Sequence, residues 1–392
     1  MPRSGPARIA VIGAGPIGLE AALAARVLGY AVTVYERGRV AEHVQRWGHV
    51  SLFTPFGMNA TPLGRAALRL DNPKHDLPGD ADIISGRDYV SAYLEPLAMT
   101  AALIECVKLE TQVVQIGRTG ILKTDGNRRS DHPFRLLLRE AKGAERIEEA
   151  DAILDCSGVY GTPRWLGDGG IPAVGESAAR AQIAYGLDDV LGADRAKYAG
   201  KSVLVVGAGH SAATQIVRLA ELAEKHQEMW IVWLARGQRS QPLPRIAGDP
   251  FRERDRLAAR ANMLATRGEG HVEFHPDSRI EEVMALGPDR GFRVAARVAG
   301  ELMSWDVERI AACVGHQPDA VLTSELLVGE IHEIRTAEPN YFVLGAKSRG
   351  RDSDFFLTTG FQQVRTALAQ IAGRSDPLAG RSPEQWIQHL GR

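Results

Sequence analysis

A glycine-rich turn between a short apolar strand and a helix constrains this chain more than any other feature. The apolar run Ile9 to Ile12 is typical of a strand buried on both faces, and it leads directly into Gly13-x-Gly15-x-x-Gly18. In this pattern the first glycine permits a tight turn, the second lets backbone N–H groups approach a pyrophosphate, and the third lets the helix pack closely on the strand. The turn therefore predicts the start of a dinucleotide-binding βαβ unit.

Two further residues complete this unit. Pro16 suits the first turn of the helix, where a missing N–H costs nothing. The second strand, Ala31 to Tyr35, ends in Glu36, whose carboxylate can accept hydrogen bonds from both hydroxyls of an adenosine ribose. Strand, loop, helix, strand and acid together indicate an adenine-dinucleotide site, with NAD and FAD both open at this point. The alternative is a glycine-rich turn before a buried helix, without a ligand.

The composition limits the class of protein. The 392 residues are 44% hydrophobic and 24% charged, which is enough to bury one large core or two moderate ones, and two domains are expected. A formal net charge of −1 gives no electrostatic reason to expect nucleic acid or an anionic membrane as a partner. Because no apolar run approaches the length of a membrane span and no hydrophobic leader precedes the first strand, we expect a cytoplasmic protein.

The cysteines and histidines argue against several kinds of site. Cys106, Cys156 and Cys313 are far apart and no Cys-x-x-Cys occurs, which argues against a disulfide scaffold, a zinc knuckle and a dithiol-disulfide reductase. His271 and His275 are four residues apart, but in an expected strand and loop. We therefore expect no metal site.

The plan of the first half of the chain repeats in the second half. A second strand and glycine loop occurs at Lys201 to Ala213, with Gly207-x-Gly209 and then Ala212 as the third small residue. Each loop is followed by a helix, a strand and a β-meander. The sequence predicts an α/β fold with two Rossmann-like dinucleotide-binding domains, each with an inserted β-meander.

Both meanders close on a strand that enters Cys-x-Gly, at residues 152–158 and 309–315. Cys156 and Cys313 are therefore equivalent by position. Neither has a basic neighbour in sequence that would lower the pKa of its thiol, so we expect small buried residues and not nucleophiles.

The two loops differ at the end of the second strand. In the second copy this strand, Met229 to Leu234, is followed by Arg236 and Arg239, with no acid in the place of Glu36. Because an acid repels a ribose 2′-phosphate and arginines bind one bidentately, the sequence favours NADPH over NADH. The alternative is that both are ordinary loop arginines. Ser211 either caps its helix or donates to the pyrophosphate, and the two roles are compatible.

Two remaining segments offer side chains for a planar ligand. The loop-rich region from Gly38 to Pro78 includes Trp47 and Asn59, and it suits either a wall against a flat ring or an ordinary packed loop. Near the C-terminus, a strand from Asn340 to Gly345 precedes a helix expected from about Gly360 to Gly373. Gln362 would lie at the N-terminus of this helix, where partial positive charge favours an anionic ring.

Two such glycine loops, each with a meander and a closing strand, resemble the two-dinucleotide-binding-domain flavoproteins. Within that superfamily the chain is most similar to the flavin-containing monooxygenase-like and N-hydroxylating branch. The resemblance covers nearly the whole chain and implies an FAD-binding domain at 1–165 and 308–392, with an NADPH-binding domain at 166–307 inserted in it. It also implies that Gly13, Gly15, Pro16 and Ile17 contact the FAD pyrophosphate, that Val113 holds the adenine through its backbone, and that Ser157 and Gly158 lie near the flavin.

The expected cofactor contacts divide between the two domains. Those to FAD are Gly13, Gly15, Pro16, Ile17, Gly18, Glu36, Arg37, Trp47, Val113, Ser157, Gly158, Gly345 and Gln362. Those to NADPH are Gly207, Gly209, His210, Ser211, Arg236 and Arg239. No catalytic side chain and no metal ligand is assigned.

Two positions depart from the pattern of this branch. The expected Phe-x-Gly and histidine before the second loop are missing between Ile171 and Lys201. The Gly-Asp pair common at the last FAD contact is replaced by Gly345-Ala346-Lys347.

The resemblance implies an NADPH-dependent FAD monooxygenase that oxygenates a small soft nucleophile, sulfur or nitrogen, through a C4a-peroxyflavin. Its partners would be a small-molecule substrate and O₂, and a homodimer is compatible with the sequence. An NADPH-dependent flavoprotein reductase or oxidase without a dithiol centre is the alternative within the same fold. A non-catalytic nucleotide-binding redox sensor is the alternative from a different class, disfavoured because a scaffold has no need of two complete nucleotide sites.

Overall fold

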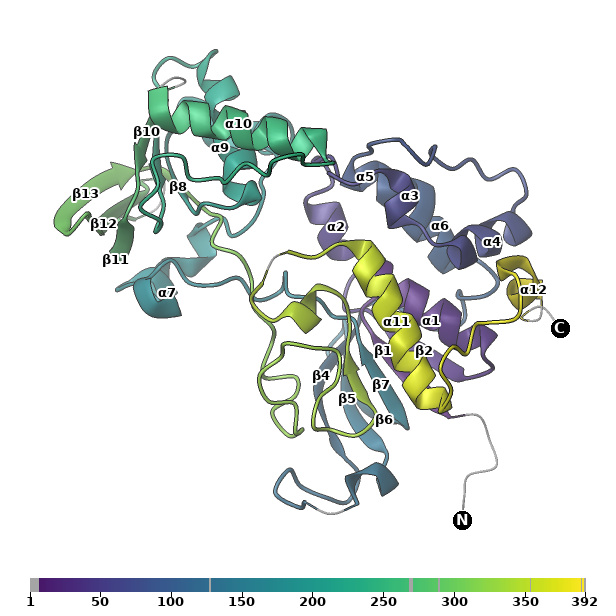
Figure 1. The fold of residues 1–392 in the computed structure, drawn as a ribbon. Helices are drawn as coiled ribbons and strands as arrows, with labels where there is room; N and C mark the ends of the chain where they lie inside the picture. Colours follow the sequence, from purple (N-terminus) through teal and green to yellow (C-terminus); the bar gives the residue numbers. More distant parts are fainter. Residues whose placement is uncertain are drawn as a thin grey trace. The chain divides into compact units, whose positions relative to one another are not determined.

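The computed structural model describes residues 7–126, 128–267, 271–287, 290–352, 354–388 and 390. The chain forms two compact units (Figure 1). The first unit comprises Met1–Thr162 and Gln317–Arg392, and the second, Pro163–His316, is inserted between these two segments. Among the described residues, no helix combines the length and the apolar character needed to cross a membrane.

A five-stranded parallel sheet forms the centre of the first unit, in the order β15-β7-β1-β2-β3. Alternate residues of β1 serve two separate cores: Ile9 and Val11 face the core that contains helix α1, whereas Ala10 and Ile12 face the core of the meander. This alternation explains why the strand is apolar throughout. The strands are β1 (Arg8–Ile12), β2 (Ala31–Tyr35), β3 (Val107–Lys108), β7 (Ala152–Asp155) and β15 (Tyr341–Val343), and those of the meander are β4 (Thr111–Arg118), β5 (Phe134–Glu140) and β6 (Glu145–Ala150).

Helix α1 packs against helix α11, which arrives from the C-terminal segment. A Cβ on Gly360 of α11 would lie 2.3 Å from Ile17 Cδ1, so the close approach of these helices requires a glycine. The helices of this unit are α1 (Pro16–Val27), α2 (Glu42–Arg46), α3 (Phe56–Asn59), α4 (Pro62–Asp71), α5 (Gly86–Tyr89), α6 (Glu95–Met99), α11 (Leu357–Ala372) and α12 (Pro383–Gln388), with a π-helix at η1 (Val90–Leu94) and 3₁₀ turns at η2 (Arg129–Asp131) and η6 (Gly345–Arg349).

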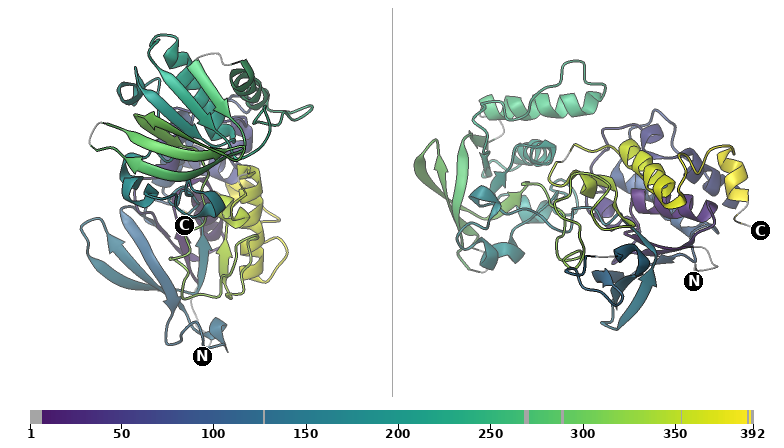
Figure 2. Two further views of the ribbon diagram at one scale, coloured as in Figure 1. Left: turned by 90° about the vertical axis from the view of Figure 1, so that its left-hand side faces the viewer. Right: turned by 60° about the horizontal axis from the view of Figure 1, so that its bottom comes forward.

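The second unit repeats this plan with a four-stranded parallel sheet in the order β10-β9-β8-β14. Both meanders, β4–β6 in blue and β11–β13 in green, are antiparallel sheets (Figure 2). The elements are β8 (Ser202–Val206), β9 (Trp230–Leu234), β10 (Val272–His275), β11 (Ser278–Ala285), β12 (Phe292–Val298), β13 (Glu301–Val307), β14 (Arg309–Ala312), α7 (Glu176–Ala179), α8 (Arg195–Tyr198), α9 (His210–Ala223), α10 (Arg252–Arg267), η3 (Asp168–Gly170) and η4 (Arg180–Gln182).

The structure differs from the expected boundaries at three places. Strand β14 pairs with β8, so residues 309–312 belong to the second unit and not to the first. The loop-rich region contains helix α4, whose N-cap Thr61 accepts a hydrogen bond from Gly64 N at 2.9 Å. Helix α11 begins at Leu357 and not at Gly360, which places Gln362 in its second turn, away from the helix N-terminus.

Candidate functional site

The first glycine loop lies at the carboxyl edge of the sheet of the first unit. Gly13 has a φ of +97° and donates its N–H to Tyr35 O at 2.8 Å, which ties the loop to the end of β2. A Cβ on Gly13 would lie 2.8 Å from Cys156 O, in the turn after β7. The residue must therefore be glycine, both for its backbone conformation and for the space it leaves.

Gly15 and Gly18 act differently in the same loop. A Cβ on Gly18 would lie 1.9 Å from Gly13 O, so this glycine permits α1 to pack against the loop, whereas a Cβ on Gly15 would meet nothing within 4 Å. Helix α1 begins at Pro16 and no side chain caps it. Its first N–H groups and the open space at Gly15 therefore form a place where a pyrophosphate can bind.

Glu36 is buried at the end of β2 and binds the loop through its carboxylate. One oxygen accepts from Ala14 N and the other from Gly38 N, each at 2.9 Å. A carboxylate has about four acceptor positions, so two remain for ligand hydroxyls. The position of Glu36 fits the predicted contact with an adenosine ribose.

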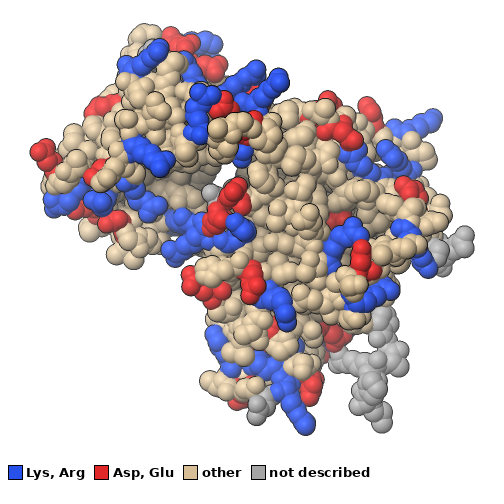
Figure 3. Space-filling view, viewed as in Figure 1, with Lys and Arg blue, Asp and Glu red and all other residues tan. Residues whose placement is uncertain are grey.

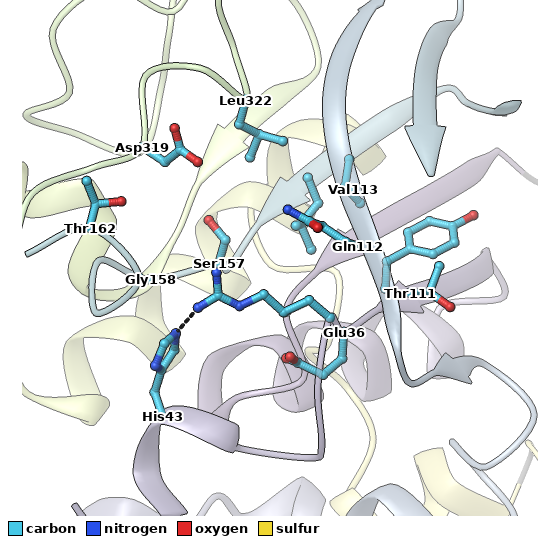
Figure 4. Close-up of a pocket in the computed structure, with 15 residues that line it drawn as sticks. Glu36, His43, Thr111, Gln112, Val113, Ser157, Gly158, Thr162, Asp319 and Leu322 are labelled. Carbon is cyan, nitrogen blue, oxygen red and sulfur yellow. Dashed lines mark hydrogen bonds between the residues drawn. The ribbon is translucent and has the colours of Figure 1, made fainter. Parts of the chain in front are cut away.

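A pocket opens beside this loop within the first unit (Figure 4). It brings together six of the predicted FAD contacts: Gly13, Glu36, Arg37, Val113, Ser157 and Gly158. The other lining residues are Ile12, Tyr35, His43, Thr111, Gln112, Gly161, Thr162, Asp319 and Leu322. Asp319 and Leu322 come from the C-terminal segment, and no sequence pattern had indicated them.

Arg37 and Val113 both line this pocket. The Arg37 guanidinium is exposed and hydrogen-bonded to His43 Nε2 at 2.9 Å, the contact dashed in Figure 4. Val113 lies on β4 at an irregularity, since the register with β5 shifts between Val113 and Gln115. Such a shift interrupts the regular ladder, as expected where a backbone turns to a ligand.

The hydroxyl of Ser157 is hydrogen-bonded to both members of a fully buried ion pair, Lys347 and Asp155. Lys347 Nζ donates to Asp155 Oδ2 at 2.7 Å and to Ser157 Oγ at 3.0 Å, and Ser157 Oγ donates to Asp155 Oδ1 at 2.6 Å. Tyr341 Oη also donates to Asp155. Burial alone would raise the pKa of Asp155, but the Lys347 ammonium and these hydrogen bonds lower it, so the carboxylate is ionised. The only proton of the Ser157 hydroxyl is thus engaged, and toward the pocket this oxygen can only accept.

Seven predicted FAD contacts lie outside the pocket lining: Gly15, Pro16, Ile17 and Gly18 of the glycine loop and the start of α1, and three residues elsewhere. Trp47 packs on the core of the first unit, Gly345 donates its N–H to Gln363 Oε1 at 2.9 Å, and Gln362 is exposed. Asn59, in the loop-rich region that could have formed a wall against a flat ring, is fully buried, and both donors of its amide are used by the carbonyls of Thr54 and Pro55. Asn59 is therefore a structural residue.

The second glycine loop repeats the backbone of the first. Gly207 has a φ of +134° and donates to Leu234 O at 3.0 Å, as Gly13 does to Tyr35 O. A Cβ on Gly207 would lie 2.3 Å from Cys313 O, and one on Gly209 would meet nothing within 4 Å. Helix α9 has Gly209 as its N-cap and no side-chain cap, so this loop also offers free N–H groups to an anion.

The side chains predicted to contact NADPH lie at the start of α9 and after β9. His210 and Ser211 are the first two residues of α9 and both are exposed, so Ser211 is not the N-cap. Arg236 and Arg239 are exposed after β9. On the face drawn in Figure 3, basic and acidic side chains are interspersed, and no part of it carries a broad field of one sign.

Burial disfavours the thiolate form of the three cysteines. All three cysteines are free. Burial raises the pKa of Cys313 to about 12 and that of Cys156 well above its usual range, and it also raises the pKa of Cys106. Cys156 and Cys313 each follow the closing strand of their unit, and their amides donate to Ile12 O and Val206 O respectively. Among the described residues no cluster of His, Cys, Asp or Glu is arranged to hold a metal ion.

Comparison with known proteins identifies the fold. The family model for pyridine nucleotide-disulphide oxidoreductases matches residues 8–42, the first glycine loop and β2. No sequence among the curated proteins matches the chain. A bacillithiol disulfide reductase from Bacillus cereus is 17% identical, with a TM-score of 0.69 over 94% of this chain and 100% of that one.

Two monooxygenases share the same architecture. A cadaverine monooxygenase of desferrioxamine biosynthesis from Erwinia amylovora, solved with FAD, is 16% identical, with a TM-score of 0.65 over 95% of each chain. An ornithine N-hydroxylase from Kutzneria sp. 744, solved with reduced FAD, NADP⁺ and L-ornithine, is 15% identical, with a TM-score of 0.60 over 94% of this chain and 99% of that one. The predicted α/β fold, with two Rossmann-like domains that each carry a β-meander, is confirmed.

Proposed function

We propose that the chain is an FAD- and NADPH-dependent oxidoreductase, with FAD in the first unit and NADPH in the second. The observation that carries this proposal is the pair of matching glycine loops, each with an uncapped helix and open space at its second glycine. Both loops fit a pyrophosphate, and only the first has a carboxylate for a ribose.

In the first unit, the backbone around Gly15 would bind the FAD pyrophosphate while Glu36 accepts from the adenosine ribose. Ser157 would accept a hydrogen bond from FAD, because Asp155 and Lys347 hold its hydroxyl in one orientation. In the second unit, the N-terminus of α9 would bind the pyrophosphate of NADPH and Arg236 its 2′-phosphate.

Bound FAD would supply hydride acceptance and the reaction with O₂. We propose that the oxygen atom passes to a small soft nucleophile, an amine or a sulfur compound. Two observations support a monooxygenase: the architecture is shared with N-hydroxylating enzymes, and the three separate thiols, with their raised pKa values, leave no dithiol to relay electrons.

A reductase or oxidase is the second candidate. It is favoured by the likeness to the bacillithiol disulfide reductase and by the missing histidine before the second loop. Such an enzyme would pass its electrons to another acceptor, or to O₂ with release of peroxide.

One rapid-mixing experiment separates the two candidates. The FAD-loaded protein is reduced with NADPH without oxygen, then mixed with O₂ in the presence of a panel of amines and thioethers, while flavin absorbance and hydrogen peroxide are followed. A monooxygenase returns slowly to the oxidised spectrum while NADP⁺ is bound, and peroxide release falls with a substrate. Immediate reoxidation, with one peroxide per NADPH for every compound, identifies the oxidase.

A further inference from the structure

One peptide has different partners in the two glycine loops. In the first unit, the N–H that follows the first glycine, Ala14 N, donates to the Glu36 carboxylate at 2.9 Å. The equivalent N–H in the second unit is Ala208 N. By strand register, Ile12 pairs with Tyr35 as Val206 pairs with Leu234, so the residue equivalent to Glu36 is Ala235.

Ala208 N–H therefore has no carboxylate from the chain. Ala235 is buried and apolar, and among the described residues no group accepts a hydrogen bond from Ala208 N. Ala208 is half-buried, so this donor is open to water or to a ligand. This donor occupies the position at which the first unit binds an anion of its own.

The carbonyl of the same peptide is held by a tryptophan that the first unit lacks. Trp233 on β9 is fully buried, packs on Phe274 with ring centroids 4.8 Å apart, and donates its indole N–H to Gly207 O at 2.7 Å. The equivalent residue of β2 is Val34, which has no donor. Because the C=O and N–H of a trans peptide point in opposite directions, holding Gly207 O toward Trp233 turns Ala208 N–H away from the core.

The third small residue of each loop is consistent with this arrangement. A Cβ on Gly18 would lie 1.9 Å from Gly13 O, yet the second unit has Ala212 at that position. The second loop thus accommodates a methyl group where the first has none, and its Gly207 carbonyl accepts the hydrogen bond from the Trp233 indole N–H.

We propose that Trp233 is a specificity-determining residue for NADPH, because it orients Ala208 N–H to donate to the 2′-phosphate of the coenzyme. The phosphate would take the place that the Glu36 carboxylate occupies in the first unit. This inference rests on the proposed function, in which the second unit binds NADPH, and it adds a backbone donor and its positioning residue to the expected arginines. Trp233 acts through the peptide and does not itself touch the coenzyme.

The test compares two tryptophans of the same strand. Trp233→Phe keeps a buried ring and removes the N–H. Trp230→Phe removes an indole N–H that donates to Glu273 at 3.0 Å on the partly exposed end of β9, and it serves as the matched control. KM for NADPH and NADH is measured by anaerobic reduction of the flavin, and calorimetry measures binding of 2′-phospho-ADP-ribose and ADP-ribose to the FAD-loaded protein.

Trp233→Phe should raise the ratio of the NADPH to the NADH KM about tenfold, as expected for a lost hydrogen bond to a charged group, while Trp230→Phe leaves this ratio unchanged. Calorimetry should show the same selective loss for the 2′-phosphorylated ligand. Equal losses for both coenzymes would overturn the proposal, because they indicate a merely structural tryptophan.

A second variant tests the idea without touching the tryptophan. Ala235→Glu supplies a carboxylate in the place of Glu36, which should compete for Ala208 N–H, weaken 2′-phospho-ADP-ribose and strengthen ADP-ribose. An unchanged preference in this variant contradicts the proposal even if Trp233→Phe does not fold. A wild-type protein that binds neither ligand would instead remove the NADPH site itself, and with it the proposed function.

Discussion

Three buried carboxylates surround the glycine loop of the first unit, and none has a counterpart in the second. Glu36 is replaced by Ala235, Asp155 by Ala312, and Glu20 on α1 by Thr214 on α9. After the corresponding strand β9, the second unit instead has the exposed Arg236 and Arg239.

The difference indicates how one backbone can serve two ligands. Buried, hydrogen-bonded carboxylates are preorganised, and a preorganised site loses little entropy when it binds. This arrangement suits a cofactor that stays bound. Exposed arginines attract a phosphate from solvent and release it again, which suits a coenzyme that exchanges.

Breaking the ion pair beneath Ser157 should have the largest effect. Lys347→Met leaves the Asp155 carboxylate buried without its cation, which costs about 3–5 kcal/mol of unfolding free energy. Lys201→Met is the control, because Lys201 pairs with Glu308 at 2.8 Å where both side chains are partly exposed, and its loss should cost about 0–1 kcal/mol. Denaturant unfolding measures both free energies. Equal losses in the two variants would show that the buried Lys347–Asp155 pair matters no more to stability than the partly exposed Lys201–Glu308 pair.

The free energy of unfolding should depend on pH because Glu20 titrates at a different pH in the folded and unfolded states. Burial raises the pKa of Glu20 from 4.5 to about 7, although the Thr61 hydroxyl, which donates to it at 2.7 Å, lowers it in part. The folded pKa lies above the unfolded one, so the protonated acid contributes stability that is complete below about pH 4.5 and is lost as the pH rises through 7. The loss should be on the order of 3 kcal/mol between about pH 4.5 and pH 8.

Glu20→Gln should flatten this dependence, since an amide does not titrate. Unfolding free energies at several pH values check the prediction. A variant that retains the full slope would show that other groups cause it.

Substituting the third small residue of each glycine loop, Gly18 or Ala212, should affect the two loops differently. Gly18→Ala places a Cβ against Gly13 O and should weaken FAD binding by about ten- to hundredfold. The matched change, Ala212→Gly, adds only the cost of a glycine in helix α9, about 1 kcal/mol. Cofactor content after purification and FAD titration of the apoprotein measure the effect, and full FAD retention in Gly18→Ala would argue against FAD at this loop.

Reversing the exposed charge should have the smallest effect. Arg236→Glu should raise KM for NADPH about tenfold, through lost attraction and added repulsion, and KM for NADH much less. Steady-state kinetics with both coenzymes tests this, with Arg239→Glu as a second position. An equal rise for both coenzymes would mean that Arg236 does not contact a 2′-phosphate.

Local patterns made the two loops predictable from sequence. Gly13, Gly18 and Gly207 are required by contacts within a strand, a turn and a helix, and these contacts recur wherever that turn occurs. The role of Glu36 was predictable because it is the acid that directly follows the short apolar strand β2. Helix α4 was missed in a region rich in turn residues, although Thr61-Pro62 is a good start signal.

Contacts between distant segments were not predictable. Lys347 and Asp155 are 192 positions apart and belong to no periodic pattern, and Asp319 reaches the pocket from the C-terminal segment. Strand β14 was assigned to the first unit, but it pairs with β8 of the second. The sequence of a closing strand does not indicate which sheet the strand joins. The hydrogen bond from Trp233 to Gly207 depends on side-chain packing that hydrophobic periodicity does not encode.

The proposed dependence on both FAD and NADPH can be tested by one anaerobic titration. Purified protein loaded with FAD is titrated with NADPH and, separately, with NADH, and the loss of oxidised-flavin absorbance is recorded. One equivalent of NADPH should bleach one equivalent of FAD, and NADH should require a much higher concentration. Protein that cannot be loaded with FAD, or flavin that NADPH does not bleach, would contradict the proposed dependence.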